Sequence, residues 1–333
     1  MKKTTRKQKR PLLAILILAM ILIVLSVISI GIGALYISPE AVVTNLLGLD
    51  HSFEFIIQQY RLPRIILAIL AGAGLAVAGA ILQGVIRNPL ASPDVVGISK
   101  GSGLAAMAVI LIFPESPVYV LPFSAFAGAA IIAVLLLMIA RKKSIQPSSL
   151  ALSGIALGAV CHAGMQYMMV KFPGDVNAAL IWLTGSLWGR NWEEVKLLAP
   201  WLLILFPIVC ILIPKLDLMS LGDELAQGLG ENANRLRFIL IFTAVALAGS
   251  CVAVVGSIGF IGLLAPHIAR RLAGEKAKYL LPASALIGAI ILLIADTLGR
   301  GIMPPVEIPA GILTAVIGAP YFLYLLKFEA RKQ

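Results

Sequence analysis

The chain has 333 residues, of which 60% are hydrophobic and only 13% are charged, and its formal net charge is +11. Soluble domains carry about 25% charged residues, so this composition excludes an ordinary soluble protein. Apolar runs of about 20 residues predict an all-α polytopic membrane protein, because a helix of that length crosses a bilayer.

Ten apolar segments are predicted to cross the membrane. Residues 1–10 form a basic head, and the apolar run after them is longer than the roughly 7–15-residue core of a signal peptide, so we predict a retained first span. The eighth segment is short and predicts a half-span. In chain order the spans are roughly 11–37, 64–85, 95–113, 119–140, 149–170, 194–214, 236–255, 258–270, 279–300 and 309–327.

The connections between spans are too short to hold a soluble domain. Residues 11–327 are therefore predicted to form one ten-helix transmembrane domain, followed by a short tail at 328–333. Small residues recur at every fourth position of the second span, which lets helices approach closely in lipid: Gly72, Ala76, Ala80 and Gly84. A compact bundle of this kind favours a transporter over a simple membrane anchor.

The distribution of basic residues predicts the orientation. With ten spans both termini lie on one side, and that side holds 21 of the 27 lysines and arginines. The positive-inside rule then places both termini in the cytoplasm of a multi-pass protein of the cell (inner) membrane. Most of the net charge is explained by topology, so nucleic acid is not predicted as a partner.

Two connections have an amphipathic character. Residues 175–192 are too short and too polar to cross the membrane and are predicted to lie along the extracellular surface. Residues 215–235 are predicted to form two short cytoplasmic helices that meet at a bend. In this segment Ser220 and Asp223 resemble a capping box, Asp223 and Glu224 suit a helix N-terminus, and an apolar stripe follows at i+4 spacing: Leu221, Leu225 and Leu229.

Catalytic and metal-binding chemistry is not predicted. A P-loop needs a lysine after a glycine, and no lysine of this chain follows one. The three cysteines fall inside apolar spans as small buried hydrophobes, and the histidines lack ligand spacing, so no cofactor is expected. The carboxylates inside the spans are few, namely Asp296 and Glu307 near outer ends, which indicates that another subunit supplies the energy.

Basic residues also gather at the predicted outer surface. Arg61 and Arg64 flank Pro63 just before the second span, and Arg300 ends the ninth. Two explanations stand at this point. The side chains either snorkel to the membrane interface, or they form a docking point for carboxylates of a partner protein.

Four separated segments, in this order, closely resemble the FecCD/BtuC family of permease subunits. They are RLPRIILAILAGAGLAVAGAILQGVIRNPLASPDVVGISKGSG (61–103), ALSGIALGAV (151–160), GSIGFIGLLAPHIARRL (256–272) and PAGILTAVIGAPYFLYLL (309–326). These permeases belong to ABC importers for iron–siderophore complexes, haem and vitamin B12. The resemblance implies the BtuC-like fold of type II ABC importers, with ten transmembrane helices and cytoplasmic termini.

The resemblance also implies partners and residue roles. A permease of this family pairs with a second permease, as a homodimer or a paralogous heterodimer, and works with two cytoplasmic ABC ATPase subunits and an extracytoplasmic binding protein. The implied roles are docking of the binding protein at Arg61, Arg64 and Arg300, a cytoplasmic gate at Asn88, Leu90, Ser148 and Ser149, a translocation path along Met165, Gln166 and Met169, and ATPase coupling at Leu221, Asp223, Glu224, Leu225 and Leu229.

The function predicted on this basis is translocation of iron(III)–siderophore complexes by a permease without an ATPase site of its own. A vitamin B12 or haem importer has the same motifs and stays open as an alternative. An ion-coupled secondary carrier is the alternative from another class, and the scarcity of intramembrane charge argues against it.

Overall fold

The computed structural model describes residues 2–117, 119–140 and 147–329, and this part of the chain is helical without strands. Its elements are α1 (Lys2–Gly31), α2 (Pro39–Leu46), the π-helical turn η1 (Ile56–Arg61), α3 (Leu62–Ile86), α4 (Ile98–Ile112), α5 (Val120–Ala140), α6 (Pro147–Lys171), α7 (Val176–Leu183), α8 (Trp192–Leu221), α9 (Asp223–Gly228), α10 (Ala233–Val255), α11 (Ile261–Ala273), α12 (Ala277–Gly301) and α13 (Ala310–Glu329).

Ten of these helices coincide with the ten predicted spans: α1, α3, α4, α5, α6, α8, α10, α11, α12 and α13. Five of them are long and apolar enough by length and composition to cross a membrane within the described residues, and α4, α5 and α13 contain shorter apolar stretches. The half-span is confirmed in α11, whose 13 residues reach only about 20 Å. The all-α fold class is therefore confirmed.

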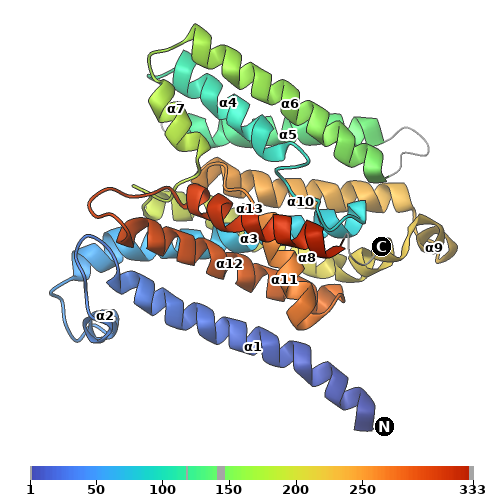
Figure 1. Ribbon diagram of the computed structural model, residues 1–333, viewed down its shortest axis with the longest axis horizontal. Coiled ribbons are helices and arrows are strands. Elements are labelled where there is room, and N and C mark those ends of the chain that lie inside the picture. Colours follow the sequence, from blue (N-terminus) through green and yellow to red (C-terminus); the bar gives the residue numbers. More distant parts are fainter. Residues whose placement is uncertain (1, 118, 141–146, 330–333) are drawn as a thin grey trace.

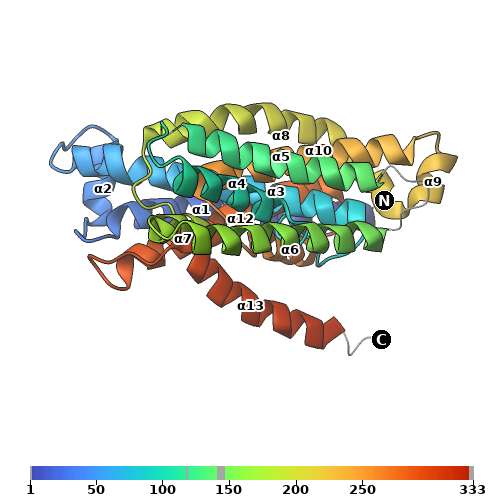
Figure 2. The same cartoon turned by 90° about the horizontal axis from the view of Figure 1, so that it is seen from above.

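The long helices run along one common direction, which gives the bundle two distinct ends (Figure 1). The start of α1, the helix α9 and the far end of α13 lie at one end, called here the α9 end (Figure 2). The short helices α2 and α7 lie at the opposite end, called here the α2 end. Helix α1 begins and helix α13 finishes at the α9 end. The chain therefore crosses between the two ends an even number of times, as ten spans predict.

Two helices end well away from the predicted ends of their spans. The first helix ends at Gly31 rather than near residue 37, because the chain turns back there and the Ile37 amide bonds the Gly31 carbonyl at 3.0 Å. The sixth predicted span reaches Leu221 rather than residue 214. It begins with a capping box between Asn191 and Glu194, and its exposed apolar face includes Cys210, contrary to the expectation that every cysteine is buried.

Helix α3 lies at the centre of the bundle, where α8, α10, α11 and α12 pack around it. The close packing predicted from its small residues is confirmed. A Cβ atom at Gly72 would lie 2.4 Å from the Gly288 carbonyl oxygen of α12, and one at Gly79 would lie 1.9 Å from the Gly262 carbonyl oxygen of α11. These helices therefore meet backbone to backbone, which only glycine permits.

Helices α4 to α7 form a second group beside this centre (Figure 1). A small apolar cluster joins α4, α6 and α7, and α5 packs against α4: the cluster consists of Met107, Leu111, Met165 and Ala179. The group joins the central helices mainly where α5 packs against α10. Helix α7 lies within the predicted 175–192 segment, and its Trp182 is buried rather than exposed to an interface.

One face of helix α13 packs against α11, α12 and the segment before α11, and the opposite face is open. At its start Gly311 approaches the Thr184 carbonyl so closely that a Cβ would lie 1.9 Å from the oxygen. Farther along, Gly318 lies against Phe260 and the Tyr321 ring contacts His267 of α11, and the far end of α13 then diverges from the bundle (Figure 2). Several apolar side chains of α13 are exposed: Ile312, Val316, Ile317 and Leu323.

Candidate functional site

Helix α9 projects at the end that bears its name and is joined to α8 through Gly222 (Figure 1). The predicted capping box between Ser220 and Asp223 is wrong. Because α8 continues through Ser220, that hydroxyl donates to the Asp217 carbonyl at 2.6 Å inside the last turn of α8. Gly222 caps α9 without a side-chain hydrogen bond and has a φ of 116°, which favours glycine.

The three leucines of the predicted stripe all face outward. Leu221 ends α8, Leu225 lies in α9 and Leu229 caps α9, and their exposed fractions are 61%, 57% and 69%. Ala226 is the residue of α9 that is buried against the bundle. The leucines thus form an apolar surface, called here the leucine surface, that the described part of the chain leaves uncovered.

Asp223 binds two arginines from different helices. Its Oδ1 accepts a hydrogen bond from Nη2 of Arg87 at 2.9 Å, and its Oδ2 accepts one from Nη2 of Arg237 at 2.5 Å. Arg87 follows the last residue of α3, and Arg237 lies in the first turns of α10. Glu224, the neighbouring acid, is exposed. A second ion pair, Lys215 with Glu231, closes the connection between α8 and α10.

The predicted gate residues lie at the same end. Asn88 and Leu90 belong to a tight turn in which the Asn88 Oδ1 accepts the Leu90 amide at 2.9 Å. Arg87, immediately before this turn, has the left-handed φ of 52°. Ser148 and Ser149 lie in the first turn of α6, and their side chains are outside the described part of the structure.

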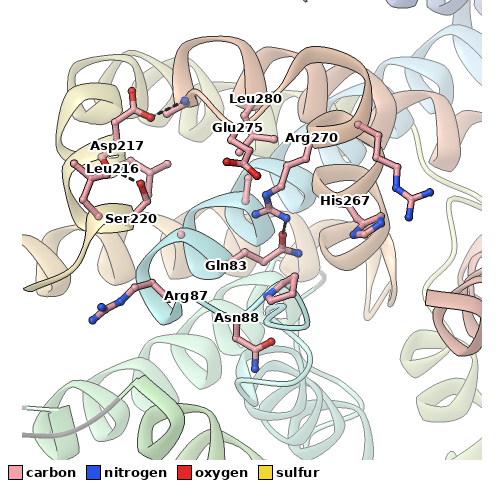
Figure 3. Close-up of a pocket in the computed structure, with 16 residues that line it drawn as sticks. Gln83, Arg87, Asn88, Leu216, Asp217, Ser220, His267, Arg270, Glu275 and Leu280 are labelled. Atoms are coloured by element: carbon pink, nitrogen blue, oxygen red, sulfur yellow. Dashed lines mark hydrogen bonds between the residues drawn. The ribbon is translucent and has the colours of Figure 1, made fainter. Parts of the chain in front are cut away.

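A cavity of about 710 Å³ lies at the α9 end, between α3, α8, α11 and α12 (Figure 3). Its wall includes Arg270, whose Nη1 donates to Oε1 of Gln83 at 2.6 Å. Asp217 fixes the opposite wall because its Oδ1 accepts the Ala277 amide at 2.8 Å. No local sequence signal marks Gln83, Arg270 or Asp217 as cavity residues, since the hydrogen-bond partner of each is far away in the sequence.

At the α2 end, the three arginines expected at a docking surface are buried. The exposed fractions of Arg61, Arg64 and Arg300 are 7%, 8% and 5%. Arg64 pairs with Asp296 at 2.8 Å and with Glu307 at 2.7 Å, and Arg300 pairs with Asp296 at 3.2 Å. The explanation by interfacial snorkelling is therefore wrong for these side chains.

Other donors of Arg61 and Arg300 bind the last turn of α1 and the segment that follows it. Arg61 donates to the carbonyls of Ile30 and Leu35, and Arg300 donates to Ile32 O at 3.1 Å and to the Ser29 hydroxyl at 2.8 Å. The arginines thus join α1, α3 and α12. Docking of the binding protein at these side chains stays a prediction. It requires the arginines to release their present contacts within this chain.

The predicted path residues on α6 do not share one face. Met165 is 3% exposed and packs against Met107 and Leu111 of α4, so its placement on an open path is wrong for this conformation. Met169 is half-buried against the same cluster. Gln166 is exposed, with its Nε2 3.3 Å from Nε2 of His162. The exposed face of α6 is therefore the one that carries Gln166.

The family of the chain follows from comparison with known proteins. The model of the FecCD transport family matches residues 21–328, nearly the whole chain. The chain belongs to the FecCD transport family. Its predicted relationship to the FecCD/BtuC permeases is thereby confirmed.

Individual relatives of this FecCD-family chain cover it from end to end. The chain is 99% identical over 333 residues, 100% of both proteins, to the Fe(3+)-citrate import system permease protein YfmE of Bacillus subtilis (strain 168). It is 40% identical, over 97% of both proteins, to the Fe(3+)-citrate import system permease protein YfmD of the same strain.

A solved structure supports the same family fold. It is described as a metal-chelate type ABC transporter in an inward-facing conformation, and it superposes with a TM-score of 0.85 at 33% identity, covering 94% of this chain and 98% of that one. The FecCD-family chain therefore has the fold of an ABC importer permease. It is the transport subunit of such an importer and not the ATPase.

Proposed function

We propose that this chain is a permease subunit of an ABC importer for iron(III) citrate, which it passes into the cytoplasm. The observation that carries the proposal is the 99% identity over the full length to a permease of an iron(III) citrate import system. This narrows the predicted iron–siderophore class to one carboxylate chelate. Vitamin B12 and haem are not favoured by that relative.

The second permease is proposed to be a paralogous subunit. Two proteins of the same strain, each named a permease of an Fe(3+)-citrate import system, are 99% and 40% identical to this chain, which fits a pair of related but different subunits. The exposed apolar side chains of α13 offer a surface for such a partner. Burial of that surface would complete the bundle from the side on which α13 stands apart.

The α9 end is proposed to face the cytoplasm and two ATPase subunits. Most of the lysines and arginines lie at connections of this end, which the positive-inside rule assigns to the cytoplasm. The leucine surface offers apolar contact area, and the cavity beside it opens toward the same side. The binding protein is then proposed to dock at the α2 end, where Arg61, Arg64 and Arg300 lie.

Transport is proposed to proceed by alternating access. The ATPases change their separation on binding and hydrolysing ATP, α9 follows that motion, and the Asn88–Leu90 turn opens or closes the end of the path. The permease makes no covalent bond. It contributes different contacts in two states, and that difference is what couples the partners.

The test is iron uptake by proteoliposomes that contain this chain, the paralogous permease and the ATPase, with ATP inside and the binding protein loaded with ⁵⁵Fe(III) citrate outside. We expect accumulation that requires ATP and stops with vanadate. An ATPase with its P-loop lysine replaced is the negative control. Uptake that persists without ATP and collapses when ion gradients are dissipated would instead establish a secondary carrier.

Competition identifies the substrate within the same assay. Unlabelled iron(III) citrate is expected to suppress ⁵⁵Fe uptake, whereas a ferric hydroxamate, haem or vitamin B12 at the same concentration is not. If one of these three compounds is transported and iron(III) citrate is not, the proposed substrate is wrong. The proposal that the chain belongs to an ABC importer would still hold.

A further inference from the structure

The carboxylate of Asp223 lies where three elements of the α9 end meet. It is the first residue of α9, and its two oxygens bind guanidinium groups from the end of α3 and from the start of α10. The two arginines are 136 and 14 residues away in the sequence, so one carboxylate joins the end of α3 to the start of α10.

Arg87 connects this contact directly to the predicted gate. The residue leaves α3 in the left-handed conformation, and the Asn88–Leu90 turn follows without any intervening residue. Its guanidinium also lies against the backbone of the α8–α9 junction, because a Cβ at Gly222 would be 3.3 Å from its Nη1. A displacement of α9 therefore pulls on the residue that begins the gate turn.

The rest of α9 is held weakly. Ala226 is its one buried residue among those described, whereas the leucines and Glu224 face outward. Arg237, by contrast, is fixed in the bundle, since its side chain is only 6% exposed. Asp223 thus has one arginine that anchors it to a rigid helix and one arginine that can transmit movement.

We infer that Asp223 and Arg87 form a mechanical link through which α9 moves the Asn88–Leu90 turn, so that Arg87 is a positioning residue for the gate. The inference rests on the proposed function, in which α9 follows the ATPase and this turn closes the path. It adds one specific ion pair, between Asp223 and Arg87, to that scheme. The link acts through the ion pair itself and not through the general stability of the protein.

The exposure of the pair supports that distinction. The side chains of Arg87 and Asp223 are 36% and 33% exposed. An ion pair at such exposure contributes little to stability, because water and salt screen it. Breaking it at Arg87 therefore leaves the fold intact while removing the connection, which makes Arg87→Gln the informative variant. Asp223→Asn also deprives the buried Arg237 of its partner and carries a folding cost.

The experiment measures iron transported per ATP hydrolysed in the proteoliposomes described above. Arg87→Gln is expected to lower this ratio at least fivefold while ATP hydrolysis continues. Arg87→Lys keeps a cation in reach of Asp223 and is expected to recover most of the ratio. Arg235→Gln is the matched control, an exposed arginine of α10 two residues from Arg237 that pairs with no carboxylate in the described part of the structure.

A double-mutant cycle separates a link from two independent effects. If the pair is the link, Arg87→Gln combined with Asp223→Asn lowers the ratio no further than the stronger single substitution. Effects that multiply, or an unchanged ratio in Arg87→Gln, overturn the inference. Absence of ATP-dependent uptake in the unsubstituted protein is a different result, since it rejects the proposed function itself.

Discussion

Arg64 and Asp296 form a buried ion pair that ties the α2 ends of α3 and α12 together. Nε of Arg64 lies 2.9 Å from Oδ1 of Asp296, and Nη2 of the same guanidinium lies 2.8 Å from that oxygen. The carboxylate is 1% exposed and also contacts Arg300. Asp296 therefore pairs with buried cations from two helices, Arg64 of α3 and Arg300 of α12, and Glu307 supplies the second carboxylate to Arg64.

Asp296→Asn is expected to destabilise the protein by about 3–5 kcal/mol, because it leaves the buried Arg300 without a carboxylate and takes one of two carboxylates from Arg64. The measurement is the folded fraction after heating in detergent, followed by size-exclusion chromatography. Glu307→Gln is the control. Glu307 is 26% exposed and pairs with Arg64 alone among the described residues, so its loss is expected to cost clearly less. Equal thermal behaviour of Asp296→Asn and the unsubstituted chain would contradict the structure.

The same burial changes how the docking prediction is tested. If Arg61, Arg64 and Arg300 only docked the binding protein, reversing their charges would abolish uptake and leave the protein in the membrane. Since all three side chains are enclosed and paired, reversal is now expected to reduce the amount of folded protein as well. Binding of the partner to folded Arg300→Lys, measured directly, is the cleaner test, because Lys keeps the charge and loses the forked geometry.

Gly79→Ala is expected to separate α3 from α11 and to lower the thermal midpoint of the purified protein. The added methyl would lie 1.9 Å from a backbone oxygen, so no side-chain movement can relieve the clash. Overpacking of a core typically costs about 1–3 kcal/mol. Gly174→Ala serves as the control because nothing lies within 4 Å of its Cβ position. A midpoint unchanged by Gly79→Ala would show that the two helices are farther apart than the structure has them.

Leu225→Asp is expected to uncouple ATP hydrolysis from uptake without disturbing insertion. Leu225 is 57% exposed, and exposed substitutions usually change stability by less than about 0.5 kcal/mol. The new charge opposes burial of the leucine surface against the ATPase. Gln227→Asp places the same charge on an exposed position of the same helix and is expected to retain more uptake. Normal coupling in Leu225→Asp would remove the leucine surface from the mechanism.

Cys210 is expected to react with a membrane-permeant maleimide in the native protein, whereas Cys251 is not. Cys210 lies on the exposed apolar face of α8, and Cys251 is fully buried between helices. Peptide mass spectrometry after labelling distinguishes the two sites. Labelling of Cys251 should appear only after denaturation. Protection of Cys210 in the assembled importer, with reaction in the isolated subunit, would place the second permease on α8 instead of α13.

The spans were predictable because the length of an apolar run directly indicates whether a helix can cross the membrane. The same signal does not report where a helix ends, so the last seven residues of α8 were missed. Residues 215–221 are partly polar and lie beyond the apolar run, yet the backbone hydrogen bonds continue through them. Helix α2 was missed although its start carries a recognisable signal, a Ser38 cap followed by Pro39 and Glu40.

The candidate site was predictable only where its residues are close in the sequence. Leu221, Leu225 and Leu229 lie within one segment, and their common exposure follows from local patterning. The partners of Arg64 and Arg87 lie 232 and 136 residues away, so their ion pairs depend on the packing of whole helices. Met165 was misplaced for a related reason. Helix α6 is apolar on several sides, and its rotation is set by contact with α4.

The exposed face of α13 has a consequence for the cell that makes this protein. The last helix of this subunit keeps an exposed apolar face, which only lipid covers until a partner subunit binds there. Copies synthesised without a partner are therefore expected to be early targets of membrane quality-control proteases. The cell therefore needs to produce this chain and the proposed second permease in equal amounts. The abundance of the scarcer permease then sets the number of working importers.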